Sequence, residues 1–99
     1  MDIIYTPELL EYMKQKNNTT ILVELVELNN TDLEITELHP FFVNERMRAQ
    51  FLKKGYRTVC TEPVEVLLPP FPLQLAETVT FGLKSVLFFK SVTYDGIKV

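Results

Sequence analysis

Residues 56–68, YRTVCTEPVEVLL, decide the fold class because their side chains alternate in character at every second position. A period of two is typical of β-strands that bury one face. Thr61-Glu62-Pro63 then predicts a three-residue turn between two strands of a hairpin. The predicted partners are Cys60 with Val64, Thr58 with Val66 and Tyr56 with Leu68. We expect all six side chains on the buried face of this hairpin.

The residues before this hairpin predict a strand, a helix and a second hairpin. Residues 1–5 read as a short strand, and Thr6, Pro7 and Glu8 form a typical helix start, with the helix ending at residue 15 or 16. Residues 21–28 and 33–38 are rich in aliphatic side chains and predict two strands joined by an Asn-rich turn at 29–32. His39-Pro40 predicts the end of the second strand.

The middle and the end of the chain complete the predicted order. Residues 44–54 predict a helix capped by Asn44, with a charge-rich loop as the alternative. Residues 79–83 and 86–92 predict two further strands, and residues 94–96 a turn. The fold class is therefore mostly β (α+β), a small sandwich or barrel of six or seven strands with one or two helices, in a single domain over residues 1–99.

Composition excludes several classes of function. Ninety-nine residues with 46% hydrophobic and 23% charged side chains suffice for one apolar core. The net charge of −3 makes a general nucleic-acid binder a poor expectation. One cysteine and one histidine exclude a multi-cysteine metal site within one chain. No signal sequence or membrane span is recognisable, so we expect a cytoplasmic protein without membrane contact.

Three segments resemble the HesB-like family of iron–sulfur biogenesis proteins, which are related to A-type carriers. These segments are residues 3–9 (IIYTPEL), residues 64–68 (VEVLL) and residues 87–99 (LFFKSVTYDGIKV). The resemblance is closest to the small single-domain branch and implies a β-rich fold. The family binds its cluster through a central cysteine and a Cys-Gly-Cys near the C-terminus. This chain has no counterpart of the C-terminal pair, and Cys60 does not match the central ligand, so the resemblance implies an inherited fold without cluster binding.

Cys60 and His39 are the only candidates for thiolate or imidazole chemistry. Cys60 is expected to act as a small core hydrophobe beside Val64, and an intersubunit metal site is the alternative. His39 has Glu37 nearby in sequence, but a general base also needs a nucleophile. A turn-edge role is therefore favoured. No nucleotide-binding or hydrolase motif occurs, so neither an enzyme nor a cofactor is expected.

Charges of opposite sign are segregated along the chain. Five acids without a base lie between residues 24 and 37, at Glu24, Glu27, Asp32, Glu34 and Glu37. Their spacing matches no calcium loop, and solvent-facing positions explain most of them. A basic patch lies in residues 44–57, at Arg46, Arg48, Lys53, Lys54 and Arg57. This patch suits phosphate, nucleic acid or an acidic partner, although a solvated helix face is the simpler interpretation.

These observations favour a non-catalytic domain of HesB-like type that acts through protein–protein contacts. The alternative is an iron–sulfur or metal handling protein that uses Cys60 at an intersubunit site. Val86-Leu87-Phe88-Phe89 is apolar on both faces of its predicted strand, so we expect self-association, as a homodimer, alongside an unknown protein partner.

Overall fold

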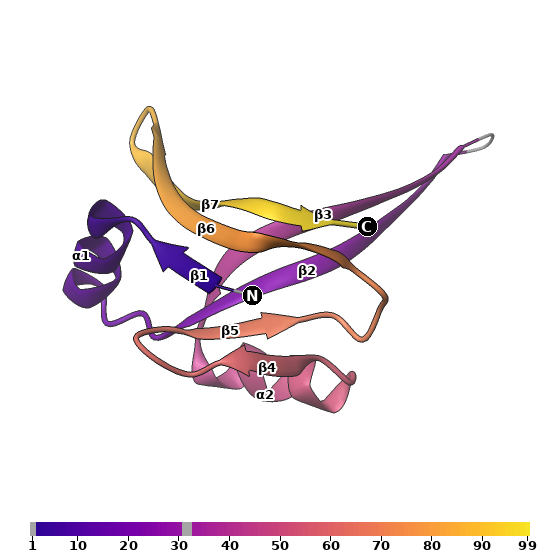
Figure 1. Ribbon diagram of the computed structural model, residues 1–99, viewed down its shortest axis with the longest axis horizontal. Coiled ribbons are helices and arrows are strands. Elements are labelled where there is room, and N and C mark those ends of the chain that lie inside the picture. Colours follow the sequence, from indigo (N-terminus) through magenta and orange to yellow (C-terminus); the bar gives the residue numbers. More distant parts are fainter. Residues whose placement is uncertain (1, 31–32) are drawn as a thin grey trace.

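The computed structural model describes residues 2–30 and 33–99, without the side chains of residues 28–30 and 33–35. Within them the chain forms seven strands and two helices (Figure 1). In chain order these are β1 (Asp2–Tyr5), α1 (Pro7–Gln15), β2 (Thr20–Asn30), β3 (Leu33–Val43), α2 (Glu45–Lys53), β4 (Arg57–Cys60), β5 (Glu65–Leu68), β6 (Gln74–Val86) and β7 (Phe89–Lys98). The predicted mostly β fold class, with its count of strands and helices, is confirmed.

The strands form two sheets that share one core. One sheet has the order β1-β6-β7, and the other has the order β3-β2-β5-β4. The main apolar cluster lies between the sheets and includes Ile21, Val23, Val66, Val79 and Phe81. Helix α1 adds Leu9 and Met13 to this cluster. A second cluster forms where α2 covers the other face of the four-stranded sheet, around Leu22, Val43, Phe51 and Leu67.

Both helices begin as their sequences predict. The Thr6 side chain accepts a hydrogen bond from the Leu9 amide at 3.3 Å, and Asn44 accepts one from the Met47 amide at 2.9 Å. Residues 44–54 therefore form a capped helix rather than a charge-rich loop. Gly55 follows α2 with φ of +95°, a left-handed conformation that is typical of the residue after a helix end.

The predicted register of the 56–68 hairpin is wrong. Strands β4 and β5 pair Arg57 with Leu68, Thr58 with Leu67 and Cys60 with Val66, and the register shifts between Thr58 and Cys60. Strand β5 is buried on both faces, because α2 covers Leu67 while Val66 and Leu68 face the main core. The prediction assumed one buried face, and Thr58 is accordingly exposed instead of buried.

The predicted break at His39-Pro40 is also wrong, because β3 continues to Val43. Strand β3 is an end strand of its sheet, and proline is tolerated at a sheet edge. The residue before a proline is pushed toward extended angles, and a strand satisfies that preference equally well. In the predicted turn at 29–32, Asn29 and Asn30 instead belong to β2, and residues 31–32 lie outside the described part of the chain.

Two predictions near the C-terminus need correction. Strand β6 runs on to Val86, so residues 86–92 contain a hairpin turn and not one strand. The expected turn at 94–96 lies inside β7, where the pairing with β6 shifts register between Leu75 and Thr80. Gly96 has φ of +93° at this irregularity, which places the turn-like residue within a strand.

Candidate interaction surface

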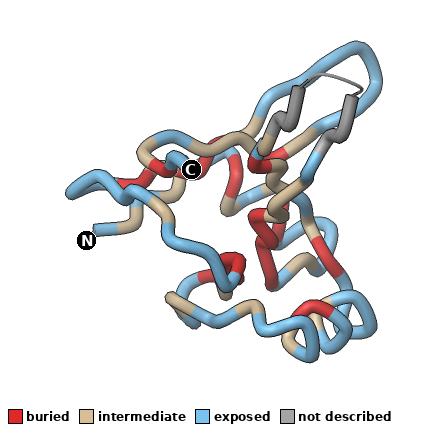
Figure 2. The backbone as a smooth tube through the Cα atoms, turned by 90° about the vertical axis from the view of Figure 1, so that its right-hand side faces the viewer, coloured by how far each residue is buried: buried red, intermediate tan, exposed pale blue. Residues whose placement is uncertain are grey.

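The turn between β6 and β7 exposes four consecutive apolar side chains, which we call the hairpin tip (Val86–Phe89). Val86 pairs with Phe89, so Leu87 and Phe88 form a two-residue loop. The exposed fractions are 53% for Val86, 89% for Leu87, 98% for Phe88 and 75% for Phe89. Residues 84–90 are all exposed, and the hairpin projects at the top of the molecule (Figures 1 and 2).

The hairpin tip also departs from ordinary turn chemistry. Two-residue hairpin loops favour Asn-Gly or Asp-Gly because their backbone needs positive φ. Leu87 has φ of +56°, a left-handed conformation that costs a residue with a Cβ about 1–2 kcal/mol. A polar turn would avoid both this cost and the exposure of two large apolar side chains. Backbone strain of this kind is concentrated at binding and switch sites.

Two lysines flank the hairpin tip. Lys84 and Lys90 are the only charged residues between positions 84 and 91, so this segment carries a charge of +2. The Lys90 ammonium lies 5.6 Å from the ring centroid of Tyr12 on α1. Cation–π attraction of this kind ties the tip end of the hairpin to α1.

A groove of about 310 Å³ opens beside the same hairpin, beginning at the Lys84–Ser91 pair two positions from the Val86–Phe89 pair, and we call it the tip-side groove. Strand β3 forms one wall, and residues of β6 and β7 form the other. Phe41 is 43% exposed, and its ring centroid lies 6.3 Å from that of His39. The lining residues are His39, Pro40, Phe41, Lys84, Ser91, Val92, Thr93 and Tyr94.

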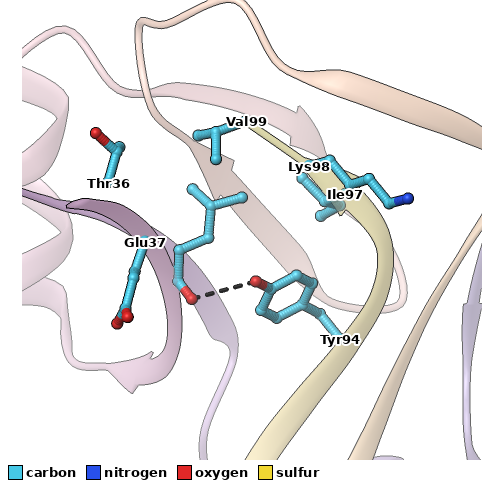
Figure 3. Close-up of a pocket in the computed structure, with 7 residues that line it drawn as sticks. Thr36, Glu37, Tyr94, Ile97, Lys98 and Val99 are labelled. Carbon is cyan, nitrogen blue, oxygen red and sulfur yellow. Dashed lines mark hydrogen bonds between the residues drawn. The ribbon is translucent and has the colours of Figure 1, made fainter. Parts of the chain in front are cut away.

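Tyr94 also lines a second groove, of about 370 Å³, on the C-terminal part of β7. Its hydroxyl donates a hydrogen bond of 3.2 Å to the backbone carbonyl of Leu38, which ties β7 to β3 (Figure 3). This second groove carries Glu37 and Lys98 in its lining and is more polar than the tip-side groove. Tyr94 thereby holds the two sheet edges together where both grooves open.

His39 and Glu37 contact each other, although the sequence showed only that they are neighbours. Their side chains approach to 2.8 Å (Nε2 to Oε2), and both are more than 40% exposed. They point to one face of β3, because their positions differ by two. The described residues contain no group of three His, Cys, Asp or Glu side chains that could hold a metal ion.

Cys60 is half-buried and packs against the main apolar cluster that includes Val64, as predicted, and its Sγ also has polar neighbours. The Tyr5 hydroxyl donates to the Cys60 Sγ at 3.5 Å, and this Sγ donates to the Glu62 carbonyl at 3.1 Å. Burial, followed by the contact with Cys60, raises the pKa of Tyr5 far above its ordinary value. Cys60 and His39 lie on opposite end strands of the four-stranded sheet, about 14 Å apart at ordinary strand spacing. They cannot bind one metal ion within a chain.

The basic patch is partly neutralised within the molecule. Arg48 forms a bidentate pair with Glu65, with an Nη2 to Oε2 distance of 3.0 Å, and it also contacts Glu45. Arg48 lowers the pKa of Glu65, and the Thr20 hydroxyl adds a hydrogen bond of 3.0 Å. Lys54 lies 4.7 Å from the ring centroid of Phe51. A binding role for the rest of the patch, at Arg46, Lys53 and Arg57, stays a prediction.

Of the predicted acids, those with described side chains lie along the ribbon formed by β2 and β3. Glu24 is directly opposite His39 in the pairing, and Glu37 is opposite Val26, so both acids share the face of His39. Glu27 lies on this ribbon as well. Asp32 is outside the described residues, and the Glu34 side chain is not described.

Comparisons with family models, with curated proteins and with solved structures find no match to this chain. The resemblance to the HesB-like family therefore stays a prediction. Over residues 2–30 and 33–99, neither helix is long and apolar enough to cross a membrane.

Proposed function

We propose that this chain is a small non-catalytic domain, resembling HesB-like proteins without their cluster ligands, that acts through protein–protein contacts made by the hairpin tip. The observation that carries this proposal is the exposure of Val86, Leu87, Phe88 and Phe89 at the end of a projecting hairpin. Single exposed apolar side chains are common on protein surfaces, whereas these four are consecutive and form one patch.

Covering the hairpin tip would gain free energy, because its exposed apolar side chains would be removed from water. Full burial of a Leu or Phe side chain contributes about 1.5–3 kcal/mol. Because Leu87 and Phe88 are almost fully exposed in the free chain, nearly all of that gain is available to a partner. Aromatic side chains are also enriched among the residues that dominate binding energies.

Self-association is the form of contact that we propose first. Strand β7 is an end strand of its sheet, and Tyr94 ties part of its outer edge to β3, so the backbone groups nearer the hairpin tip are the ones offered to another chain. The hairpin tip lies at the end of this strand, which allows apolar and backbone contacts to form together. We propose a homodimer on this basis, and a further protein partner would use the same tip.

The test compares the association of the natural chain with that of a Phe88→Ser variant by sedimentation equilibrium. We expect the natural chain to dimerise at micromolar concentrations and the variant to associate at least about 30-fold more weakly, as for a central anchor residue. Phe71→Ser is the matched control, because Phe71 is 41% exposed but lies outside the tip. Equal association of all three proteins, or a monomeric natural chain at high micromolar concentration that also captures no protein, would contradict the proposal.

A further inference from the structure

We infer that the further protein partner of the hairpin tip is an extended segment in which an acidic residue stands between two apolar residues at alternate positions. This segment lies along the hairpin, with one apolar side chain against the tip, its carboxylate against Lys84 and its second apolar side chain in the tip-side groove. The inference rests on the proposed function, and it states the chemistry of a partner other than a second copy.

The hairpin tip and the tip-side groove form one continuous surface on one face of the hairpin. Lys84 pairs with Ser91, two positions along each strand from the Val86–Phe89 pair, and side chains two positions apart share a face. Thr93 is the next residue of β7 on this face, and it lines the groove. The surface therefore presents, in order, an apolar pair, a lysine–serine pair and the groove.

The spacing of this surface is that of an extended chain. A strand rises about 3.3 Å per residue, so successive side chains on one face of β7 are about 6.6 Å apart. An extended segment of a partner has the same distance between its own alternate side chains. Three successive side chains on one face of that segment therefore meet the apolar pair, the lysine–serine pair and the groove in turn.

Charge selects an acidic residue for the central position of the segment. Among the described residues that line the groove, Lys84 is the only Lys or Arg, and none is Asp or Glu. His39 also lines the groove, but Glu37 already contacts it at 2.8 Å. Lys90 lies on the opposite face of the hairpin, over the Tyr12 ring. Lys84 is therefore the cation that a carboxylate on this surface would contact.

The tip-side groove has room for one bulky apolar side chain. An apolar cavity of roughly 150 Å³ accepts benzene, and this groove has a volume of about 310 Å³. Phe41 is 43% exposed on the β3 wall of the groove, so an occupant would remove its ring from water. Offset or edge-to-face contact with this ring favours an aromatic occupant over an aliphatic one.

Neither a folded second copy nor an anionic membrane fits this surface as well. Within the described part of this chain, every acid with apolar residues two positions before and after it has at least one of those residues buried, as for Leu22 and Val79. A folded copy therefore does not present the pattern. Segments that bind anionic membranes carry clusters of about four to eight Lys or Arg, whereas segment 84–91 carries two.

The test titrates the full chain into fluorescein-labelled nine-residue peptides and measures fluorescence anisotropy. The acidic peptide carries Leu, Asp and Phe at alternate central positions, with Gly, Ser and Thr elsewhere. The basic peptide has Lys in place of Asp, and the polar peptide has Ser in place of Leu and Phe. We expect the acidic peptide to bind with a Kd of about 100 μM or tighter, and the other two to bind at least about 10-fold more weakly. A weaker Kd, or equal binding of the acidic and basic peptides, would overturn the inference.

Reversing the charge of Lys84 tests the central contact. We expect Lys84→Glu to weaken binding of the acidic peptide at least about 10-fold and to strengthen binding of the basic peptide. Lys98→Glu is the matched control, because it makes the same change in net charge on β7 but lines the second groove. Equal effects of the two substitutions would show long-range attraction without a site and would overturn the inference.

Shortening Phe41 tests the groove. We expect Phe41→Ser to weaken binding of the acidic peptide at least about 10-fold. Phe71→Ser is the control, because Phe71 is 41% exposed but does not line the groove, and it should leave binding unchanged. Unchanged binding in Phe41→Ser would show that the groove is not the site.

Self-association separates this inference from the proposed function. If Phe88→Ser weakens self-association but the acidic peptide does not bind, the inferred partner is wrong and the proposed function stands. If neither Phe88→Ser nor Phe89→Ser changes self-association or peptide binding, the tip makes no contact and both are wrong. Sedimentation of the natural chain with phosphatidylserine vesicles, lost in Lys84→Glu and without peptide binding, would also overturn the inference.

Discussion

Leu87 combines a left-handed backbone with a nearly fully exposed apolar side chain, and neither property favours the isolated fold. Asparagine adopts positive φ more readily than leucine, and it is a common residue of hairpin loops. The proposed contact would explain the leucine, because its side chain and backbone do not stabilise the hairpin itself.

We expect Leu87→Asn to stabilise the folded monomer by up to about 1 kcal/mol while it weakens association. Thermal unfolding in a Phe88→Ser background measures the monomer alone, and the expected rise in Tm is about 4–8 °C at most. Sedimentation of Leu87→Asn in the natural background measures association. A variant that lowers the Tm of the monomer would show that Leu87 has a packing role in its own chain.

Glu65 gives the molecule an acid-sensitive contact. Arg48 lowers the pKa of Glu65, so this group favours the folded state above its unfolded pKa of about 4.3. That contribution is lost as the pH falls below 4.3 and through the lower pKa of the folded state. We expect the free energy of unfolding of Glu65→Gln to depend less on pH in this acidic range than that of the natural chain. Urea denaturation between pH 2 and pH 7 provides the measurement.

The matched control for this prediction is Glu45→Gln. Glu45 also contacts Arg48, but its side chain is 80% exposed, and that of Glu65 is 15% exposed. The control should keep the pH dependence of the natural chain. If both variants behave alike, the pairing of Glu65 with Arg48 does not produce the acid sensitivity.

We expect substitutions of Cys60 by serine or alanine to change the stability of the fold only slightly. Its Sγ accepts from Tyr5 and donates to the Glu62 carbonyl, and a serine hydroxyl can make both hydrogen bonds. A wholly apolar setting would make Cys60→Ala milder than Cys60→Ser. With polar neighbours present, we expect both variants to stay within about 1 kcal/mol of the natural chain in urea denaturation.

We also expect the natural chain to bind no iron–sulfur cluster. One cysteine and one histidine per chain fall short of the ligands that a cluster needs, and a dimer could not easily bring two of each together, because Cys60 is half-buried and lies on the opposite end strand from His39. Anaerobic reconstitution with iron and sulfide, followed by metal analysis and absorption spectroscopy, tests this expectation. Stoichiometric iron that disappears in Cys60→Ala would contradict it and would support the metal-handling alternative.

At the scale of elements, Gly96 permits the irregular pairing of β6 and β7. Its φ is +93°, and a Cβ built there would lie 2.6 Å from the Thr78 carbonyl oxygen and 3.3 Å from the Val79 Cα. Backbone atoms cannot move aside as a flexible side chain can. We expect Gly96→Ala to destabilise the fold by at least about 2 kcal/mol in urea denaturation.

Gly55→Ala is the control for this substitution. Gly55 has a similar φ of +95°, but its added Cβ would meet the Pro70 side chain at 3.4 Å. The difference between the two variants therefore measures the close backbone approach at Gly96. Equal destabilisation would mean that positive φ alone determines the effect.

Elements with strong local signals were predictable from the sequence. Helices α1 and α2 begin at the predicted caps, because Thr6 and Asn44 act on amides only three residues away. The register of β4 against β5 was not predictable, since it depends on α2 covering Leu67 from the second face. The course of β3 through Pro40 depends on the sheet order, which no local pattern contains.

At the scale of the whole molecule, dimerisation predicts that thermal stability depends on concentration. A partner that binds only the folded chain stabilises it in proportion to the logarithm of its concentration. For a homodimer of this length, a 100-fold rise in concentration should raise the Tm by about 4–8 °C. Phe88→Ser should show no such dependence in scanning calorimetry. A concentration-independent Tm in the natural chain would contradict the proposed dimer.

The hairpin tip of the candidate site could be predicted in part from the sequence, and the groove could not. The apolar run at residues 86–89 suggested adhesion, although it was read as a strand because its turn lacks glycine and asparagine. The groove could not be predicted from the sequence, because Phe41 and Tyr94 belong to strands that are far apart in sequence. They meet only where β3 approaches β7. Because His39-Pro40 predicts the end of a strand, Phe41 is not expected on a strand that borders a groove.

The parallel pairing of β1 with β6 has a consequence for how the chain is made. Asp2 lies beside Thr78 and Tyr5 beside Phe81, so the first strand meets its partner 76 residues later. At ordinary rates of translation this interval lasts about 4–15 s. During that time β1 has no sheet to join and Leu9 and Met13 of α1 lack the β6 part of their core, whereas β2 and β3 are already free to pair. Residues 20–68, which hold the four-stranded sheet, are therefore made before β6, and β1 can join its sheet only after β6 has followed.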